Sequence, residues 1–137
     1  MLKKTIKFND YNGVERTEDF YFNLSKAELM EMEMSTSGGL AEMIQKIVAT
    51  QDAPAIIKIF KDLVLKAYGE KSLDGKYFNK FDEDGRPLSA KFAQTEAYSI
   101  LFMELATDDV KAAEFINGVV PGDMAQKAAL PKKSAKD

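Results

Sequence analysis

Carboxylates are the side chains of this sequence with the clearest potential for chemistry. Two aspartates precede glycines, at Asp74-Gly75 and Asp84-Gly85, and an Asp-Gly pair is also found inside calcium loops. An EF-hand loop needs oxygen ligands at its first and last positions and glycine at its sixth. The register on Gly85 begins at Lys80 and ends at Lys91, and the register on Gly75 ends at Phe81. Neither register can hold calcium, so we interpret both as turns and expect no metal site.

The remaining acidic pairs offer no catalytic arrangement. Carboxylates recur at Glu31 and Glu33, and as Asp82 with Asp84. A glycosidase holds its two carboxyl groups across a cleft, with one pKa raised by its surroundings. Here one pair points from different sides of an expected helix and the other lies in a turn, so we interpret them as solvated. Gly38-Gly39 could present backbone N–H groups to an anion, but a break between two helices explains it better.

The absence of two residue types removes most other chemistry. The chain of 137 residues contains no histidine and no cysteine. This excludes disulfides, thiolate metal sites and Ser-His-Asp or Cys-His catalysis. No phosphate-binding loop of the G-x-x-x-x-G-K-[ST] type is present. We therefore expect no catalytic residue and no cofactor, and the residues by themselves describe a protein that is not an enzyme.

Charge and hydropathy indicate the compartment and exclude two partners. The net charge is −3, and residues 121–137 carry four lysines against two aspartates, so residues 1–120 carry −5. An acidic body disfavours nucleic acid as a partner. No apolar run is long enough to cross a membrane, and the first residues return to charge too soon for a secretory signal. We expect a cytoplasmic protein that binds neither nucleic acid nor membrane.

The first third of the chain predicts a hairpin followed by a helix. Apolar residues alternate with polar ones over 2–9 and 14–22, although Arg16 and Glu18 interrupt the second segment near the turn. This alternation is the period of a strand. Asn12-Gly13 lies between these segments and is a strong hairpin signal, because both residues tolerate positive φ. Ser25 and Glu28 have the spacing of a capping box. A helix is therefore expected over about 26–35.

Periodicity predicts four more helices. We expect them over about 40–50, from Asp52 to Tyr68 with Gly69 as the C′ residue, over 90–106 with Ser89 as the N-cap, and from Asp108 to near Asn117-Gly118. Residues 70–88 read as a polar loop that forms either a second short hairpin or a mobile arm. The predicted fold is α+β and mainly helical: an N-terminal hairpin packed on about five helices in one domain over 1–120. A flexible Lys/Ala-rich tail is expected over 121–137.

Two helices carry more apolar surface than one buried face needs. Six large apolar side chains fall within eight positions of the fourth helix, between Tyr98 and Leu105. Such a helix is central in the core or is shared with another protein. The first helix carries a run of methionines, and methionine side chains adapt to variable partners. We expect Met30, Met34, Phe102 and Met103 to contribute to partner binding, with plain core packing as the alternative.

Four segments resemble small proteins from the tail-gene region of long-tailed phages and prophages. The similar stretches run over 20–29, over 65–78, from Gln94 through Thr107, and from Ala113 to Gly118 before Pro121. Proteins of this type are assigned as tail assembly chaperones. The resemblance implies a non-enzymatic protein without catalytic residues.

The resemblance also implies partners. Tail assembly chaperones bind the tape-measure protein, keep it soluble, help to recruit the major tail protein, and self-associate. A homo-oligomer in the host cytoplasm is therefore expected, and the edge strand of the hairpin points the same way. The family is often made in two lengths by ribosomal frameshifting, and Lys132-Lys133 is where we expect slippage. A structural virion component, such as a tail or head-completion protein, is the alternative function.

Overall fold

The N-terminal hairpin forms as predicted, with its turn at Asn12-Gly13. Strand β1 (Leu2–Asn9) pairs antiparallel with β2 (Glu15–Phe22). The Gly13 N–H donates to the Asp10 carbonyl, and Gly13 has a φ of 81°. The Asp10 N–H donates to the Val14 carbonyl at 2.9 Å, which makes a three-residue loop with glycine in the left-handed region. This is a three-residue hairpin loop with a bulge, in which Gly13 takes the positive φ that the sequence allowed for it.

A four-stranded antiparallel sheet, in the order β1-β2-β3-β4, takes the place of the isolated hairpin. The computed structural model describes residues 1–35 and 53–121. The remaining elements in these ranges are α1 (Lys26–Ser35), α3 (Ala53–Ala67), β3 (Tyr68–Lys71), β4 (Phe78–Asn79), α4 (Leu88–Phe92), α5 (Glu96–Thr107) and α6 (Asp109–Val119). The mixed α+β architecture is thus confirmed. The helix predicted at 40–50 and the tail beyond Pro121 lie outside the described residues.

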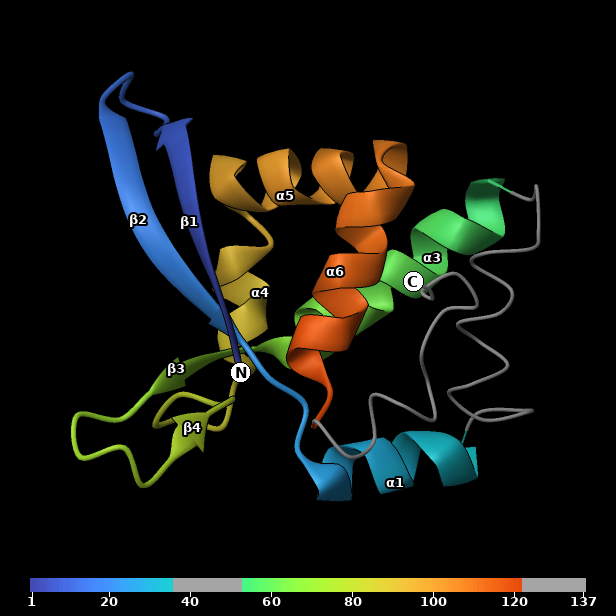
Figure 1. Ribbon diagram of the computed structural model, residues 1–137. Coiled ribbons are helices and arrows are strands. Elements are labelled where there is room, and N and C mark those ends of the chain that lie inside the picture. Colours follow the sequence, from blue (N-terminus) through green and yellow to red (C-terminus); the bar gives the residue numbers. More distant parts are fainter. Residues whose placement is uncertain (36–52, 122–137) are drawn as a thin grey trace.

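The helices cover one face of the sheet and leave the other face polar. In β1 and β2 the even-numbered side chains Ile6, Phe8, Phe20 and Phe22 are buried, whereas the odd-numbered positions are mostly exposed. Figure 1 shows the hairpin rising beside α4 and α5, with α6 descending from the end of α5 and α1 at the opposite end of the molecule. The alternation seen in the sequence therefore separates the core from solvent.

Aromatic rings form the centre of the core. Phe22 is fully buried and contacts three rings at centroid distances between 5.3 and 5.8 Å, those of Tyr68, Phe92 and Phe115. Tyr68 also stacks on Phe92 at 4.3 Å with parallel planes. Because these residues come from β2, β3, α4 and α6, one cluster joins the sheet to the helices. Burial beside Glu70 raises the pKa of Tyr68 to about 12, so its hydroxyl stays neutral in the fold.

Two predicted boundaries were wrong, and both errors lie next to this cluster. Gly69 is not a C′ residue: α3 ends at Ala67 and the chain continues directly into β3, where Gly69 pairs with Tyr21. The helix predicted over 90–106 is two helices, α4 and α5. Ser89 is not an N-cap, because Pro87 precedes α4. Thr95 begins α5 instead, with its hydroxyl accepting from the Tyr98 N–H.

Two further predictions are confirmed, whereas the start of a helix predicted at Asp52 lies outside the described residues. Asp108 caps α6 by accepting hydrogen bonds from the N–H groups of Val110 and Lys111, although this helix runs through Gly118 to Val119. In the 70–88 loop, the hairpin alternative is the correct one, since β3 pairs with β4. A second turn follows at Asp82–Arg86, closed by a bridge between Phe81 and Pro87.

Candidate partner-binding surface

The interior of the described part of the chain is apolar. Every buried side chain in residues 1–32 and 57–121 is apolar. In the described ranges no group of three or more acidic side chains could hold a metal ion. Among the described core residues, burial raises the pKa of Tyr68, whose hydroxyl donates to Glu70. Two of the residues predicted to bind a partner, Met30 and Met103, are exposed instead.

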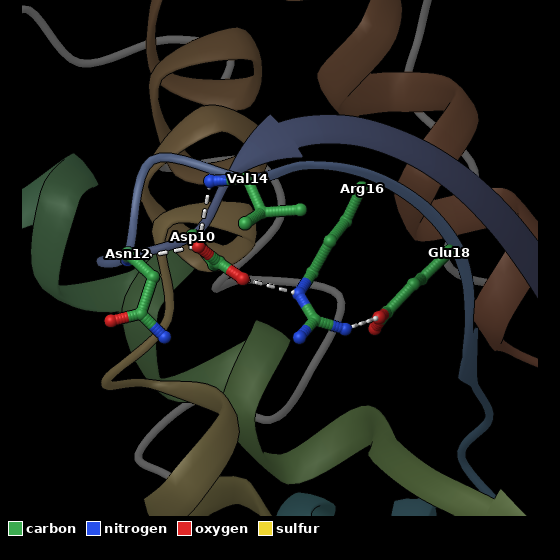
Figure 2. Close-up of polar contacts among 5 residues, drawn as sticks. All are labelled: Asp10, Asn12, Val14, Arg16 and Glu18. Carbon is green, nitrogen blue, oxygen red and sulfur yellow. Dashed lines mark hydrogen bonds and ion pairs between the residues drawn. The ribbon is translucent and has the colours of Figure 1, made fainter.

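The aspartates of the turns are occupied by the backbone. Asp10 Oδ1 accepts from the N–H groups of Asn12 and Val14, and Asp10 Oδ2 accepts from Arg16 at 2.7 Å, as Figure 2 shows. The Arg16 hydrogen bond, reinforced by that of Val14, holds the pKa of Asp10 below its usual value. Asp82 repeats the arrangement, accepting from the N–H groups two and four residues on. Asp74 also closes a turn, by accepting from the Lys76 N–H. The turns predicted at Asp74-Gly75 and Asp84-Gly85 are confirmed, since both glycines have positive φ.

The N-terminus of α1 is fastened to the sheet by one lysine. The predicted capping box is formed: Ser25 and Glu28 exchange hydrogen bonds of 2.9 and 3.1 Å. Lys80 Nζ, on the segment after β4, donates to Glu28 Oε2 at 2.8 Å and to the carbonyls of Asn23 and Lys66. Lys80 thereby joins the start of α1 to the end of α3. Met30, two residues after Glu28 in α1, is 56% exposed.

This anchor should make stability depend on pH. Burial opposes ionisation of Glu28, but hydrogen bonds from Lys80 and Ser25 outweigh it, so the pKa of Glu28 lies below its ordinary value of 4.5. A lowered pKa contributes stability that is present above 4.5 and is lost as the pH falls. We expect Glu28→Gln to flatten the decline of unfolding free energy below roughly pH 5, measured by urea denaturation.

The matched control for this measurement is Glu31→Gln, which removes an exposed carboxyl from the same helix. It should keep the slope of the parent protein. Equal slopes for Glu28→Gln and the parent would contradict the role given to the Lys80–Glu28 pair.

The outer face of α5 carries no charge. Ala97, Leu101 and Leu105 are buried against the sheet and the neighbouring helices. The exposed positions are Ser99, Ile100, Met103, Ala106 and Thr107, and we call these five residues the outer face of α5. Its two glutamates lie elsewhere: Glu104 binds Lys4 and Glu96 accepts from Tyr11. Helices facing water normally carry charges on that side, so this face is suited to contact with another protein.

The residues singled out from the sequence do not form one site. Met103 is 57% exposed on the outer face of α5. Phe102 is half-buried and packs at the edge of this face against Tyr98, at 5.8 Å. Met30 lies on α1, and Figure 1 places α1 and α5 at opposite ends of the molecule. The side chain of Met34 lies outside the described residues. Met30 and Met103 therefore belong to two separate surfaces, one on α1 and one on α5.

Ile100 is the residue of this surface that sequence reasoning missed. It is 44% exposed and precedes Met103 by one helical turn, so both side chains lie on one face. The apolar run from Tyr98 to Leu105 indicated that α5 has apolar side chains on more than one face. The run alone did not show which face packs on the sheet and which is exposed.

Comparison with known families agrees with a surface built for binding. The family model of phage tail assembly chaperones matches residues 1–137, the whole of the sequence. The chain belongs to the phage tail assembly chaperone family. No curated protein and no solved structure gives a match. Membership in this family suggests a non-enzymatic role.

Membership also bears on the setting in which the chaperone works. In the described ranges, no helix is long and apolar enough to cross a membrane. A phage tail assembly chaperone acts in the host cell while the tail is being built, and the family implies interaction with tail proteins. Its binding surfaces therefore have protein partners.

Proposed function

We propose that this chaperone binds the tape-measure protein of its phage and keeps it soluble until the tail is assembled. The single observation that supports the proposal is the uncharged outer face of α5, with Ile100 and Met103 exposed at its centre. A long helical client has apolar stripes that must be covered before assembly, and an apolar helix face is the complementary surface. The client stripe would lie along α5.

The exposed methionine of α1 gives the chaperone a second contact. Met30 is exposed, whereas Leu29 beside it is fully buried and Met32 packs against the core. An anchored helix with an adaptable side chain can follow clients of varying shape. Because α1 and α5 are far apart, one client would have to run along the molecule to meet both. We propose α5 as the main contact and the α1 methionines, Met30 and Met34, as an auxiliary one.

The further roles suggested by the resemblance belong to the same proposal. The major tail protein would be recruited around the chaperone-bound client. A longer product, made by slippage at Lys132-Lys133, would carry an additional domain for that contact. The nucleotide sequence tests this part directly, because slippage needs a run of repeated bases at these codons and an open overlapping frame.

The main proposal is tested by co-expression with the tape-measure gene. Ile100→Gln with Met103→Gln should leave stability within about 0.5 kcal/mol, since surface substitutions rarely cost more. The soluble fraction of the client should fall severalfold. Leu73→Gln is the matched control, because Leu73 is a fully exposed apolar residue on the β3–β4 turn, and it should leave the client soluble.

The α1 contact is examined in the same assay with Met30→Gln. We expect a smaller loss of soluble client than with the α5 double variant. Full protection of the client by the α5 variant would overturn the assignment of the main contact. If the soluble fraction of the client then fell only with Met30→Gln, the client-binding surface would be that of α1.

A further inference from the structure

Besides the outer edge of the two-residue strand β4, two longer strand edges of the sheet are open in the described part of the chain. Strand β1 ends the strand order, so one of its sides has no partner strand there. Strand β2 pairs with β3 only through Tyr21 with Gly69 and Phe22 with Tyr68. Beyond these pairs β3 turns away, and Figure 1 shows the two strands splaying apart. Residues 15–19 of β2 therefore face open space on the side of β3.

The turn fixes which backbone groups these edges expose. The Asp10 N–H donates to the Val14 carbonyl, so the even-numbered residues of β1 and β2 bond to each other. In an antiparallel sheet, successive residues direct their N–H and C=O groups to opposite sides. The odd-numbered Glu15, Thr17 and Asp19 consequently direct theirs toward the open side of β2. In the same way Lys3, Thr5 and Lys7 direct theirs away from β2, along the free edge of β1.

Between the diverging strands lies a cleft that can admit a strand. It has a volume of about 480 Å³ and is lined by Asp19 and Tyr21 on one side and by Glu70, Lys71 and Leu73 on the other. Leu73 is fully exposed at its mouth. An open strand edge in such a cleft is a template for pairing with another chain.

The charges on the two edges are opposite in sign. The free edge of β1 carries Lys3 and Lys7, and the open edge of β2 carries Glu15 and Asp19. Pairing of two β2 edges about Thr17 would place glutamate opposite aspartate, and pairing of two β1 edges would place lysine opposite lysine. Like charges directly opposite each other destabilise a sheet. The charge pattern therefore disfavours pairing of β1 with β1 and of β2 with β2, and favours pairing of β1 with β2.

We propose that β1 of one copy of this chain adds to the open edge of β2 of a second copy, antiparallel, within residues 15–19. The register that matches the charges sets Lys3 opposite Asp19, Thr5 opposite Thr17 and Lys7 opposite Glu15. Each pair consists of residues whose backbone groups face the new partner. The same side chains lie on the polar outer face of the sheet, so no apolar residue changes sides.

The ionic contacts within one copy leave these groups available. Among the described residues Lys3 has no acidic partner, and Asp19 accepts only from Thr5 Oγ1, at 2.6 Å. Lys7 and Glu15 are 3.3 Å apart, but both are about two-thirds exposed, and such pairs are weak. Lys4 is already bound to Glu104 and does not enter the argument. A second copy would thus add ion pairs rather than replace strong ones.

Two different edges in contact make a heterologous interface. Such an interface repeats from copy to copy and closes into a ring or extends as a filament. The mode of assembly does not depend on which client the chaperone binds. It also leaves the outer face of α5 uncovered, because α5 packs on the inner face of the sheet.

The test is sedimentation velocity on two charge-reversed variants. The first combines Lys3→Glu with Lys7→Glu, and the second combines Glu15→Lys with Asp19→Lys. Each variant alone presents edges of one sign, so its association should weaken at least tenfold and its mass should approach the monomer value of 15.3 kDa. Mixed in equal amounts, the two should associate again, because every junction then joins opposite charges. Lys61→Glu with Lys91→Glu, exposed lysines of α3 and α4, should associate like the parent.

Three results would overturn the proposal: a parent protein that stays monomeric at tens of micromolar, a charge-reversed variant that associates alone, or a mixture that stays monomeric. A circular dichroism melt establishes that each variant is folded. Should either fail to fold, Thr17→Pro replaces it, because it removes one N–H on the open side of β2 and spares the ladder to β1. Association of folded Thr17→Pro at the strength of the parent would also overturn the proposal.

Discussion

Replacing Phe22 by alanine is expected to lower the free energy of unfolding by about 4 kcal/mol. Phe22 is fully buried and contacts the rings of Tyr68, Phe92 and Phe115. The substitution removes transfer free energy and leaves a cavity between the sheet and the helices, and surrounding atoms refill such a cavity only in part. A loss of this size is a large fraction of the stability of a typical domain.

Denaturation in urea measures this loss, with Tyr21→Ala as the matched control. Tyr21 is the neighbouring aromatic residue on the other face of β2 and is only half-buried, so its truncation should cost roughly 1 kcal/mol. Similar losses for the two variants would mean that the aromatic cluster is not the centre of the core.

The elements that could be predicted from the sequence are those fixed by neighbouring residues. The alternation of β1 and β2 needs only a strand period and a turn, and the capping box of α1 needs only Ser25 and Glu28 three residues apart. Asp108 likewise caps α6 by accepting from the N–H groups of Val110 and Lys111, two and three residues on. In each case the stabilising contact spans a few positions, so the local pattern determines the structure.

The boundaries that failed depend on contacts distant in the sequence. The α4–α5 break turns Phe92 toward Phe22 and Tyr68, and nothing near Phe92 in the sequence announces these rings. Lys80 could not be recognised as the anchor of α1, because its partner Glu28 is 52 positions away. The polar loop that contains Lys80 was expected to be either a hairpin or a mobile arm, and only the tertiary contact decides between them.

In the candidate surface, too, the sequence predicted what depends on neighbouring residues and missed what depends on tertiary contacts. The apolar run of α5 indicated that more than one face would be apolar, and Met103 was correctly placed among its surface residues. Which side chains point outward follows from how α5 lies on β1, and this arrangement exposes Ile100 while it half-buries Phe102. A helical period gives the faces of a helix but not their orientation.

Gly69 was assigned the wrong role, and its actual role leads to a second large effect. It has an ordinary negative φ, unlike the turn glycines 13, 75 and 85, so the backbone conformation does not require glycine there. Space does. A Cβ at this position would lie 2.5 Å from the Phe78 ring and 2.8 Å from the Asn79 carbonyl oxygen. Both distances are shorter than van der Waals contact, and the second involves backbone.

We therefore expect Gly69→Ala to destabilise the protein by about 2 kcal/mol, within the range for overpacked positions. The Phe78 ring can swing aside, but the Asn79 carbonyl can move only if β4 separates from β3. The damage should be local, so hydrogen exchange should accelerate at the amides of the β3–β4 pairs and much less in β1.

A double variant separates the two clashes. Phe78→Ala removes the ring contact and leaves the carbonyl contact, so Gly69→Ala should cost less in the Phe78→Ala background than in the parent, yet still cost something. If the cost vanished there, the ring alone would explain the need for glycine. If Gly69→Ala were neutral in the parent protein, β3 and β4 would not be held at this spacing, and the anchoring of α1 through Lys80, which follows β4 directly, would have to be reconsidered.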